Sequence, residues 1–445
     1  MTNLIIHFSK YVIIVLMIFY TLYSFLVFTY DDEERQASLY RKQNVLTLLF
    51  HFICFLVIYL EEPKIETIYF YGAQVVFFLA AIILYTTLYP RIARVILNHM
   101  LMLLSIGLVM ITRLRFEQGI RQFVFMVLAL AVSLIVPVIV RKVRSLAELR
   151  LIYGIVGVVS LLAVLVAGGI SNGAKLGFTI GPVNIQPSEF VKLLFVFFVA
   201  SSLYKKRDFR NVCITTIVAA AHVLILVISR DLGAALIIFV VYLVMLYCAT
   251  GKFVYPLAGL AAGSIAAFGA YHLFSHVQAR VIAWKDPIAS YDEQGYQVAQ
   301  SLFAIGTRGW FGMGLCQGMP ETIPVATSDF IFSALCEEMG IFFGLCLILI
   351  CLSCYMMFLN VAMKFRSVFY KLVALGLGTC YIAQTFLNIG GVIKFIPSTG
   401  VTLPLVSYGG SSLISTMVMF AIVQGLYLLR EDEERIIEKK RQKSR

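Results

Sequence analysis

The chain is built from long apolar stretches, each close to the length that crosses a lipid bilayer. Of its 445 residues, 60% are hydrophobic and 13% are charged, whereas soluble domains carry about 25% charged residues. A helix needs about 20 apolar residues to span the hydrocarbon core, and it satisfies its own backbone hydrogen bonds there. The repeated stretches therefore predict an all-α, polytopic membrane protein.

About thirteen stretches have the hydropathy expected of membrane spans. They cover residues 10–30, 44–61, 67–89, 93–112, 121–140, 151–169, 187–204, 212–229, 231–250, 254–275, 329–359, 367–393 and 406–429. The eleventh stretch is longer than a bilayer requires, which predicts a tilted helix or one with an end outside the membrane.

Basic residues concentrate in alternate loops, and this placement predicts the orientation. The loops at 35–42, 91–94, 141–150, 205–210 and 364–371, and the tail from residue 431, are rich in Lys and Arg. The positive-inside rule places this side, including the C-terminus, in the cytoplasm. No basic patch is interleaved with aromatic residues, so the net charge of +12 does not indicate nucleic-acid binding. Segment 112–121 is the exception, because Arg113, Arg115 and Arg121 fall on the outer side and suggest a functional use.

Three predicted outer loops, at 170–186, 276–328 and 394–405, hold nearly all of the polar, Gly- and Pro-rich sequence. Loops held by rigid elements commonly carry function, so we expect the active surface on the outer face. The largest loop contains Asp286 and Asp292. A carboxylate at the edge of a low-dielectric region is suited to acid–base work, and the alternative is that both are ordinary solvated acids.

The helix predicted after the first outer loop begins with a charged pair. Glu189 falls in its first turn, where a carboxylate suits the helix dipole, and Lys192 follows three residues later on the same face. Ionisable residues at the bilayer edge are functional candidates by default, and an ion pair that only orients the helix is the alternative. Arg230 and Asp231 separate two apolar spans, either as a simple hairpin or as polar lining of the same outer cavity.

Six motifs, in this order, resemble the SEDS family (shape, elongation, division and sporulation), which includes RodA, FtsW and SpoVE. They are GAKLGF at 173–178, IQPSEFVK at 185–192, RDLGAAL at 230–236, GYQVAQSLFAIG at 295–306, SDFIFSALCEEMG at 328–340 and PSTGVTLPLVSYGGSS at 397–412. The resemblance implies a ten-span helical core at 93–430, with a large structured extracellular loop at 276–328. Residues 1–92 would add about three spans outside the resemblance, and 431–445 a charged cytoplasmic tail.

The resemblance also implies an activity. SEDS proteins polymerise lipid II, an undecaprenyl diphosphate-linked disaccharide peptide, into glycan strands on the outer face of the cytoplasmic membrane, together with a class B penicillin-binding protein. A general base deprotonates the acceptor GlcNAc hydroxyl, which attacks the MurNAc anomeric carbon with inversion while the lipid diphosphate leaves. The alternatives are a lipid II flippase and a non-catalytic scaffold for a penicillin-binding protein. Few charges lie within the spans and the acids gather on one face, which favours glycosyl transfer.

The family's essential acid lies shortly before its GYQ motif, in the pattern DPxGxGYQ, and this chain departs from that pattern. It reads DPIASYDEQGYQ from residue 286 to 297. Asp286 keeps the following proline but lies far from Gly295, whereas Asp292 lies close to Gly295 and lacks the proline. Family members with WxDP first and the essential acid later favour Asp292, so Asp286 is the second candidate.

The same resemblance implies residues that bind the substrate. Glu189 and Lys192 match the family's paired cavity charges, and Arg121 matches an arginine at the start of its second span. Lys192, Arg121 and Lys175 would stabilise the departing diphosphate, although GAKLG replaces the family's GARRW and weakens the case for Lys175. The other candidates within the motifs are Gln186, Tyr296, Gln297, Asp329 and Ser407. No dedicated ligand cluster for a metal is visible, so a divalent cation, Mg²⁺ or Mn²⁺, would only assist.

Overall fold

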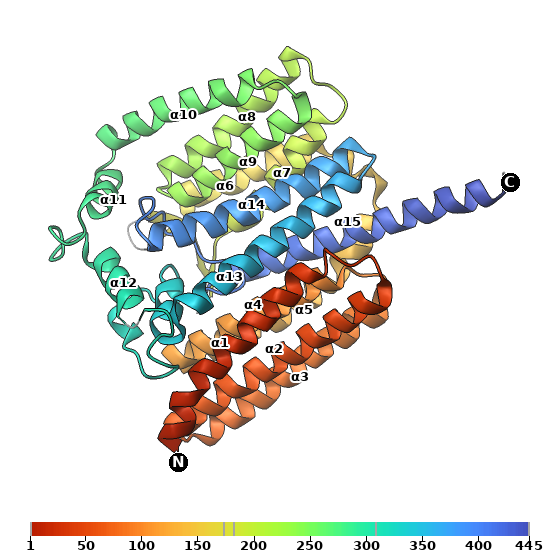
Figure 1. Ribbon diagram of the computed structural model, residues 1–445. Coiled ribbons are helices and arrows are strands. Elements are labelled where there is room, and N and C mark those ends of the chain that lie inside the picture. Colours follow the sequence, from red (N-terminus) through yellow and green to blue (C-terminus); the bar gives the residue numbers. More distant parts are fainter. Residues whose placement is uncertain (1, 172–173, 181–182, 308, 444–445) are drawn as a thin grey trace. The chain divides into compact units, whose positions relative to one another are not determined.

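The computed structural model describes residues 2–171, 174–180, 183–307 and 309–443, and these residues are nearly all helical (Figure 1). Within that part of the chain, 12 helices are long and apolar enough to cross a membrane. A further helix, α7 (Pro187–Leu203), has 17 residues and is slightly shorter than these 12. With α7 included, each of the thirteen predicted stretches corresponds to a helix, which confirms the polytopic all-α prediction.

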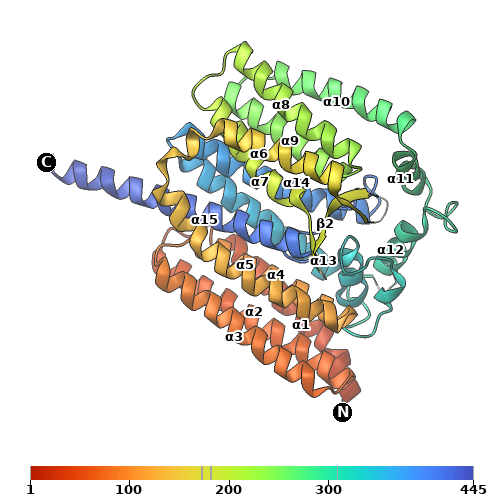
Figure 2. The same cartoon turned by 180° about the vertical axis from the view of Figure 1, so that it is seen from behind.

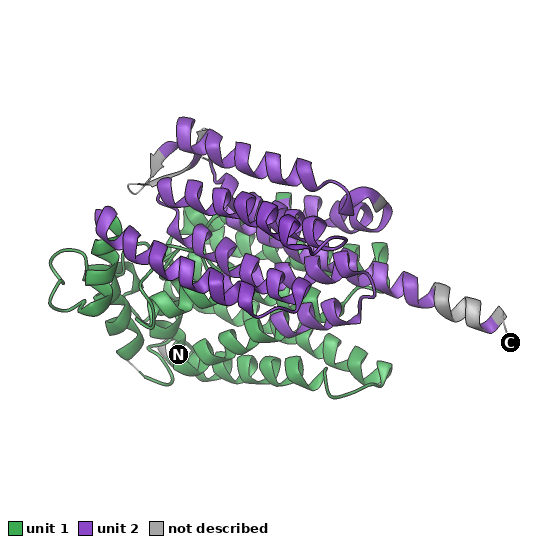
Figure 3. Cartoon of the chain, turned by 90° about the horizontal axis from the view of Figure 1, so that it is seen from above, with its two compact units in different colours: residues 1–128, 276–354, 385–409 green, residues 129–275, 355–384, 410–445 purple. Residues whose placement is uncertain are grey.

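The chain divides into two compact units, which Figure 3 colours separately. Unit 1 comprises residues 1–128, 276–354 and 385–409, and unit 2 comprises residues 129–275, 355–384 and 410–445. Unit 1 therefore combines the N-terminal extension with the largest outer loop, and the two are far apart in sequence.

Unit 1 includes α4 (Arg94–Leu114) and the three helices that precede it. These are α1 (Thr2–Leu26), α2 (Glu33–Glu61) and α3 (Ile65–Leu88), which run side by side in Figures 1 and 2. Helix α2 packs on α1, α3 and α4. Every residue from 95 to 112 of α4 is buried, so this helix has no face left for lipid.

The long loop at 276–328, which the sequence analysis predicts on the outer side, is structured, as predicted. It contains α11 (Ser275–Lys285), α12 (Tyr296–Gly306) and the short 3-10 helix η2 (Pro320–Thr322) before α13 (Ile331–Lys364) begins. The long eleventh stretch is resolved as two helical segments, because Gly340 inside α13 has a non-helical backbone with φ 88° and ψ 168°. The first segment, 331–339, follows directly from the loop.

Unit 2 is a helical bundle that includes α7 and its neighbours. Helix α7 packs on α6 (Arg150–Ala167), α8 (Phe209–Ile228), α9 (Leu232–Thr250) and α15 (Gly410–Lys443), as Figure 2 shows for α6 to α9. Other elements of the chain are α5 (Phe116–Lys142), η1 (Arg144–Ala147), α10 (Val254–Leu273) and α14 (Val368–Val392). Helix α15 begins at Gly410, four residues later than predicted, because the SYGG sequence before it is not helical.

The loop between α6 and α7 contains strands that the sequence did not predict. Strands β1 (Gly169–Ser171), β2 (Ala174–Ile180) and β3 (Val183–Ile185) form an antiparallel sheet in the order β1-β2-β3. The register pairs Ile170 with Lys175 and Phe178 with Ile185. The sheet delivers the chain to Gln186, the residue that precedes α7.

Candidate active site

The two candidate acids of unit 1 lie on a tight turn between α11 and α12. Gly295 donates its N–H to Ser290 O at 2.8 Å, which closes the turn. A side chain at Gly295 would place its Cβ only 2.3 Å from Pro287 O, so the glycine of the GYQ motif is required by this close approach. Tyr296 and Gln297 follow in the first turn of α12 and are exposed.

Asp286 and Asp292 differ in what their carboxylates already bind. One oxygen of Asp286 accepts the backbone N–H groups of Ile288 at 3.1 Å and Ala289 at 2.9 Å. This is the local bonding by which an aspartate holds a turn. The Asp292 side chain is exposed and makes no hydrogen bond or ion pair with other described residues. Asp292 is therefore the acid whose lone pairs face solvent.

Asp329 forms a second acidic position in unit 1, beside Arg280 and Gly400. The Cβ of a side chain at Gly400 would lie 3.5 Å from Arg280 Nη2 and 3.6 Å from Asp329 Oδ2, so all three residues converge. Burial raises the pKa of the half-buried Asp329 carboxyl, against the opposing effects of the Arg280 charge and a hydrogen bond from Ser328. Arg280 also donates to Ser398 O at 3.1 Å, which ties α11 to the last outer loop.

Ser407 and Gln122 hold the backbone around Asp329. The buried Ser407 hydroxyl donates to Ser328 O at 2.5 Å and accepts from Leu403 N at 2.8 Å. Gln122, which is also buried, donates to Ser407 O at 3.1 Å and accepts from Gly409 N at 3.3 Å. The Ser407 hydroxyl is thus used by the protein itself, and its role as a substrate ligand stays a prediction.

The predicted charge pair of unit 2 is formed and deeply buried. Lys192 Nζ lies 3.0 Å from Glu189 Oε2 and donates to Gln384 Oε1 at 2.7 Å, and its side chain is 3% exposed. Ser415 Oγ donates to Glu189 Oε2 at 3.1 Å. Removing one partner of a buried pair leaves an uncompensated charge and costs about 3–5 kcal/mol. Because an ammonium has three N–H donors, Lys192 has one left beyond these two oxygens.

Gln186 and Asp231 extend the polar network at the same end of α7. Asp231 Oδ2 accepts from Ser188 Oγ at 2.8 Å and from Gln186 Nε2 at 3.2 Å, while its Oδ1 accepts from Ala234 N and caps α9. Asp231 therefore caps α9 directly after the turn and also bonds the start of α7, whereas its role as lining of an outer cavity stays a prediction. Arg230 makes the turn itself, with φ 66°.

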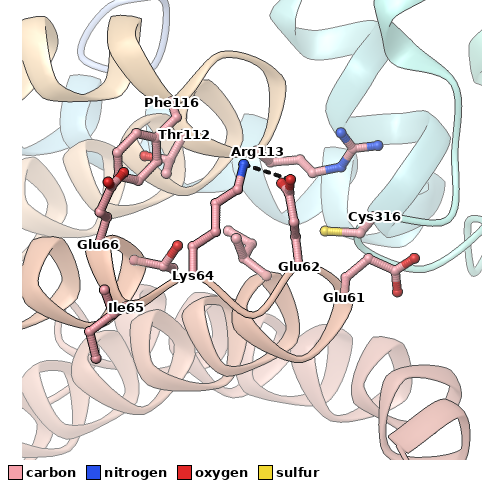
Figure 4. Close-up of a pocket in the computed structure, with 11 residues that line it drawn as sticks. Glu61, Glu62, Lys64, Ile65, Glu66, Thr112, Arg113, Phe116 and Cys316 are labelled. Carbon is pink, nitrogen blue, oxygen red and sulfur yellow. Dashed lines mark ion pairs between the residues drawn. The ribbon is translucent and has the colours of Figure 1, made fainter.

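The three arginines of segment 112–121 have different surroundings. The Arg113 guanidinium lies 2.6 Å from Glu321 Oε1 and 3.1 Å from Glu338 Oε1, with its side chain 16% exposed. It borders a cavity of about 650 Å³ that also adjoins the turn between α2 and α3, where Figure 4 shows the ion pair of Lys64 with Glu62. Arg115 and Arg121 are exposed, and among the described residues their side chains have no ion pair. Arg113 is thus used structurally, and Arg121 is open to solvent.

The remaining residues are Lys175, which was predicted, and four that the sequence analysis did not identify. The side chain of Lys175 lies outside the described part of the chain, so its predicted role stays a prediction. Sequence reasoning missed Gln122, Arg280, Gln384 and Asn388. Asn388 donates to Asp329 O at 2.9 Å and to Val401 O at 2.7 Å. Gln384 and Asn388 could have been identified from the sequence, because two amide residues four positions apart in an apolar stretch lie on the same helix face.

The sequence model of the FtsW, RodA and SpoVE family, described as cell cycle proteins, matches residues 93–428, which is more than half of the chain. The chain belongs to the FtsW/RodA/SpoVE family. The peptidoglycan glycosyltransferase RodA of Mycobacterium tuberculosis is 36% identical over 349 residues, covering 72% of this chain and 74% of that protein. The probable peptidoglycan glycosyltransferase FtsW of Tolumonas auensis is 36% identical over 296 residues, covering 64% of this chain and 75% of that protein.

Solved structures share the FtsW/RodA/SpoVE fold. A chain from a peptidoglycan synthase complex, reported for its coordination of polymerization and crosslinking, matches with a TM-score of 0.64 and 24% identity, over 76% of this chain and 97% of that one. The rod shape determining protein RodA of Thermus thermophilus matches with a TM-score of 0.58 and 23% identity over the same shares. The family match begins at residue 93, so helices α1 to α3 precede it.

Proposed function

We propose that this chain is a peptidoglycan glycosyltransferase that extends glycan strands from lipid II. The observation that carries the proposal is the family match over residues 93–428, together with relatives named peptidoglycan glycosyltransferase at 36% identity. The helical membrane fold and a structured loop with an open carboxylate agree with a polymerase that takes a lipid-linked sugar.

Asp292 is the proposed general base. Its exposed carboxylate has no partner among the described residues, so it is available to accept the proton of the acceptor hydroxyl. Asp286 is less suited, because one of its oxygens already holds two backbone N–H groups of the turn. The turn closed by Gly295 fixes the short segment that carries both acids.

Cationic residues take the role of stabilising the diphosphate that leaves. Negative charge grows on its oxygens in the transition state, and preorganised positive charge lowers that barrier. Lys192, with one N–H to offer, and the exposed Arg121 are the proposed cations, and Glu189 holds the Lys192 ammonium in place. Among the described residues no group of three or more His, Cys, Asp or Glu side chains is arranged to hold a metal ion.

The proposal also places the protein in its cellular setting. The basic alternate loops put the C-terminus in the cytoplasm and the loop that carries Asp292 on the outer face of the cytoplasmic membrane. The proposed partner is a class B penicillin-binding protein that cross-links the strands. The structural relative from a synthase complex that couples polymerization to crosslinking supports such a partnership.

The test is lipid II polymerisation by the purified protein with its cognate penicillin-binding protein. We expect Asp292→Asn to slow polymerisation by about 10²- to 10⁴-fold, the usual contribution of a general base. Glu293→Gln, which removes the neighbouring exposed acid, is the matched control and should stay within about twofold of wild type. Asp286→Asn should cost about 1 kcal/mol of stability through the loosened turn while polymerisation continues.

Other outcomes would change the assignment. An active Asp292→Asn with an inactive Asp286→Asn would move the base to Asp286. Activity in both variants would end the general-base proposal. A wild-type protein that moves lipid II across vesicles without polymerising it would favour the flippase instead.

A further inference from the structure

Three helices of unit 2 enclose an apolar groove near the first turn of α6. The groove lies between α6, α7 and α8, which run side by side in Figures 1 and 2, and has a volume of about 340 Å³. Pockets of about 300–1,000 Å³ are the usual size for small-molecule ligands. Its lining is mostly aliphatic and includes Leu151, Ile155, Val158, Val159, Ile214 and Val218.

Arg150 stands at one end of this groove and is held there by α8. Its Nη1 donates to Asn211 Oδ1 at 3.1 Å. Asn211 is fixed in turn, because its amide donates to Ser202 O at 2.7 Å and to Lys206 O at 2.8 Å. No carboxylate of the described residues lies within ion-pair distance of Arg150. A guanidinium has five N–H donors in a fork that suits a phosphate, so most of them are available.

Ser202 supplies an independent sign that the groove holds a polar group. Its side chain lines the groove, the residue is 4% exposed, and its Oγ has no hydrogen-bond partner among the described residues. A buried hydroxyl without a partner costs about 1–3 kcal/mol. An oxygen-bearing ligand in the groove would remove that cost.

Two segments at this end of unit 2 are rich in basic residues, of which Arg141 is ion-paired with Asp432 of α15 at 2.6 Å. Segment 141–150 carries four basic residues and one acid, and segment 204–211 also carries four and one. The two acids are Glu148 and Asp208, and Glu148 already lies 3.9 Å from Lys205 Nζ. An anionic surface attracts such residues by about 1 kcal/mol each.

We propose that the groove is a binding site for an anionic phospholipid of the adjoining leaflet. One acyl chain lies along the aliphatic lining between α6 and α8. The phosphate accepts hydrogen bonds from Arg150, and an ester oxygen of the glycerol region accepts from Ser202. An apolar groove that ends at an uncompensated guanidinium matches a phospholipid better than it matches a free anion, because a free anion would leave the aliphatic wall unused.

The test measures lipids retained by the whole protein in native mass spectrometry after exchange into detergent. Dioleoyl phosphatidylglycerol and dioleoyl phosphatidylcholine are the probes, because they share acyl chains and differ in charge. We expect one phosphatidylglycerol to be retained at about fivefold lower concentration than phosphatidylcholine, the factor that one cation of this kind supplies. Arg150→Gln should abolish this preference. Lys206→Gln, an equal loss of charge at an exposed position outside the groove, should leave it intact.

A groove-filling variant tests the acyl part of the site. Val158→Phe should lower retention of both lipids about equally, and Val159→Trp at the exposed rim gives the same test if Val158→Phe folds poorly. Equal effects of Arg150→Gln and Lys206→Gln would overturn the proposal, since they would show only diffuse attraction. Undiminished retention in the filled groove would also overturn it. Displacement of phosphatidylglycerol by an equal concentration of glycerol 1-phosphate would show a site for phosphate alone.

Discussion

At the scale of single residues, neighbouring acids on one loop have separate tasks. Asp286 shapes the turn through two backbone N–H groups, and Asp292 is left open to solvent. Asp329 is different again, because burial raises its pKa while the Arg280 charge opposes the rise. The sequence ranked Asp292 above Asp286 by motif spacing but did not show what each carboxylate contacts. Their environments make Asp286 a residue that shapes the turn, Asp292 a candidate base and Asp329 a half-buried carboxyl beside a guanidinium.

The raised pKa of Asp329 predicts a pH dependence of stability. Between the ordinary aspartate pKa of about 3.9 and the raised folded value, the folded state holds a proton that the unfolded state has released. The contribution of Asp329 to the free energy of unfolding therefore falls as the pH rises through that window and is constant above it. We expect the unfolding midpoint of wild type, relative to Asp329→Asn, to decrease over this range.

Tryptophan fluorescence follows this unfolding, because Trp284 lies in unit 1 and donates to Lys394 O at 3.2 Å. Asp31→Asn, at an exposed position of the same unit, is the control and should track wild type. If the difference in unfolding midpoint between wild type and Asp329→Asn stays constant from pH 4 to pH 8, the raised pKa of Asp329 is contradicted.

At the scale of elements, the break in α13 explains the glycine-rich part of the large loop. The non-helical Gly340 leaves backbone groups on either side without helical partners. Segment 309–314 forms hydrogen bonds with four of these groups. Before the break, Glu337 O and Glu338 O accept from Met313 N and Gly314 N, both at 2.8 Å. After the break, Ile341 N and Phe342 N donate to Gly309 O and Trp310 O, both at 3.2 Å. Loop and helix are thus one hydrogen-bonded element, although the sequence shows them as separate segments.

This arrangement predicts that Gly340 tolerates no side chain. A Cβ at Gly340 would lie 2.4 Å from Trp310 O and 2.6 Å from Gly312 N, in a conformation with φ 88° that L-residues rarely adopt. Backbone strain of this kind costs about 1–3 kcal/mol before the clash is added. We expect Gly340→Ala to lower the free energy of unfolding by about 3 kcal/mol or more, measured by thermal unfolding in detergent.

Gly72→Ala is the matched control, because Gly72 lies within α3 of the same unit and nothing lies within 4 Å of a Cβ there. It should be neutral or stabilising by up to about 1 kcal/mol, since alanine favours helix. Equal midpoints for the two variants would refute the role given to the break.

At the scale of the whole molecule, the extra N-terminal helices are joined to the family core by buried polar contacts. Tyr20 Oη lies 3.1 Å from His99 Nδ1, and His51 Nδ1 lies 2.9 Å from Ser105 Oγ. Asn98 donates to Gln43 Oε1 at 3.0 Å. These pairs link α1 and α2 to α4, whose apolar stretch they enclose. Helices α1 to α3 therefore form part of the packing of unit 1.

These contacts predict that the family core, residues 93–445, does not fold stably without helices α1 to α3. Removing residues 1–92 would take away the partners of Asn98 and Ser105 and the Tyr20 partner of His99, whose Nε2 keeps its bond to Ser353 Oγ at 2.9 Å. Each buried polar group left unpaired costs about 1–3 kcal/mol. We expect the truncated chain to lose its monodisperse peak in detergent size-exclusion chromatography. Removing residues 436–445 from the charged tail is the control and should leave the peak unchanged. A monodisperse core of residues 93–445 with the wild-type melting temperature would contradict the prediction.

The sequence by itself determined the membrane class, the thirteen helices, the family and the motifs that carry the candidate site. Apolar stretches and turn residues determine structure locally, and residues a few positions apart can be related without knowledge of the tertiary structure. Glu189 and Lys192 were therefore correctly paired from their spacing of three. Only the tertiary structure showed that Gln384 completes that pair, that Arg280 faces Asp329, and that Gln122 holds Ser407 and Gly409. The physical reason is that these partners are far apart in sequence, and burial and charge at a residue are set by which helices pack around it.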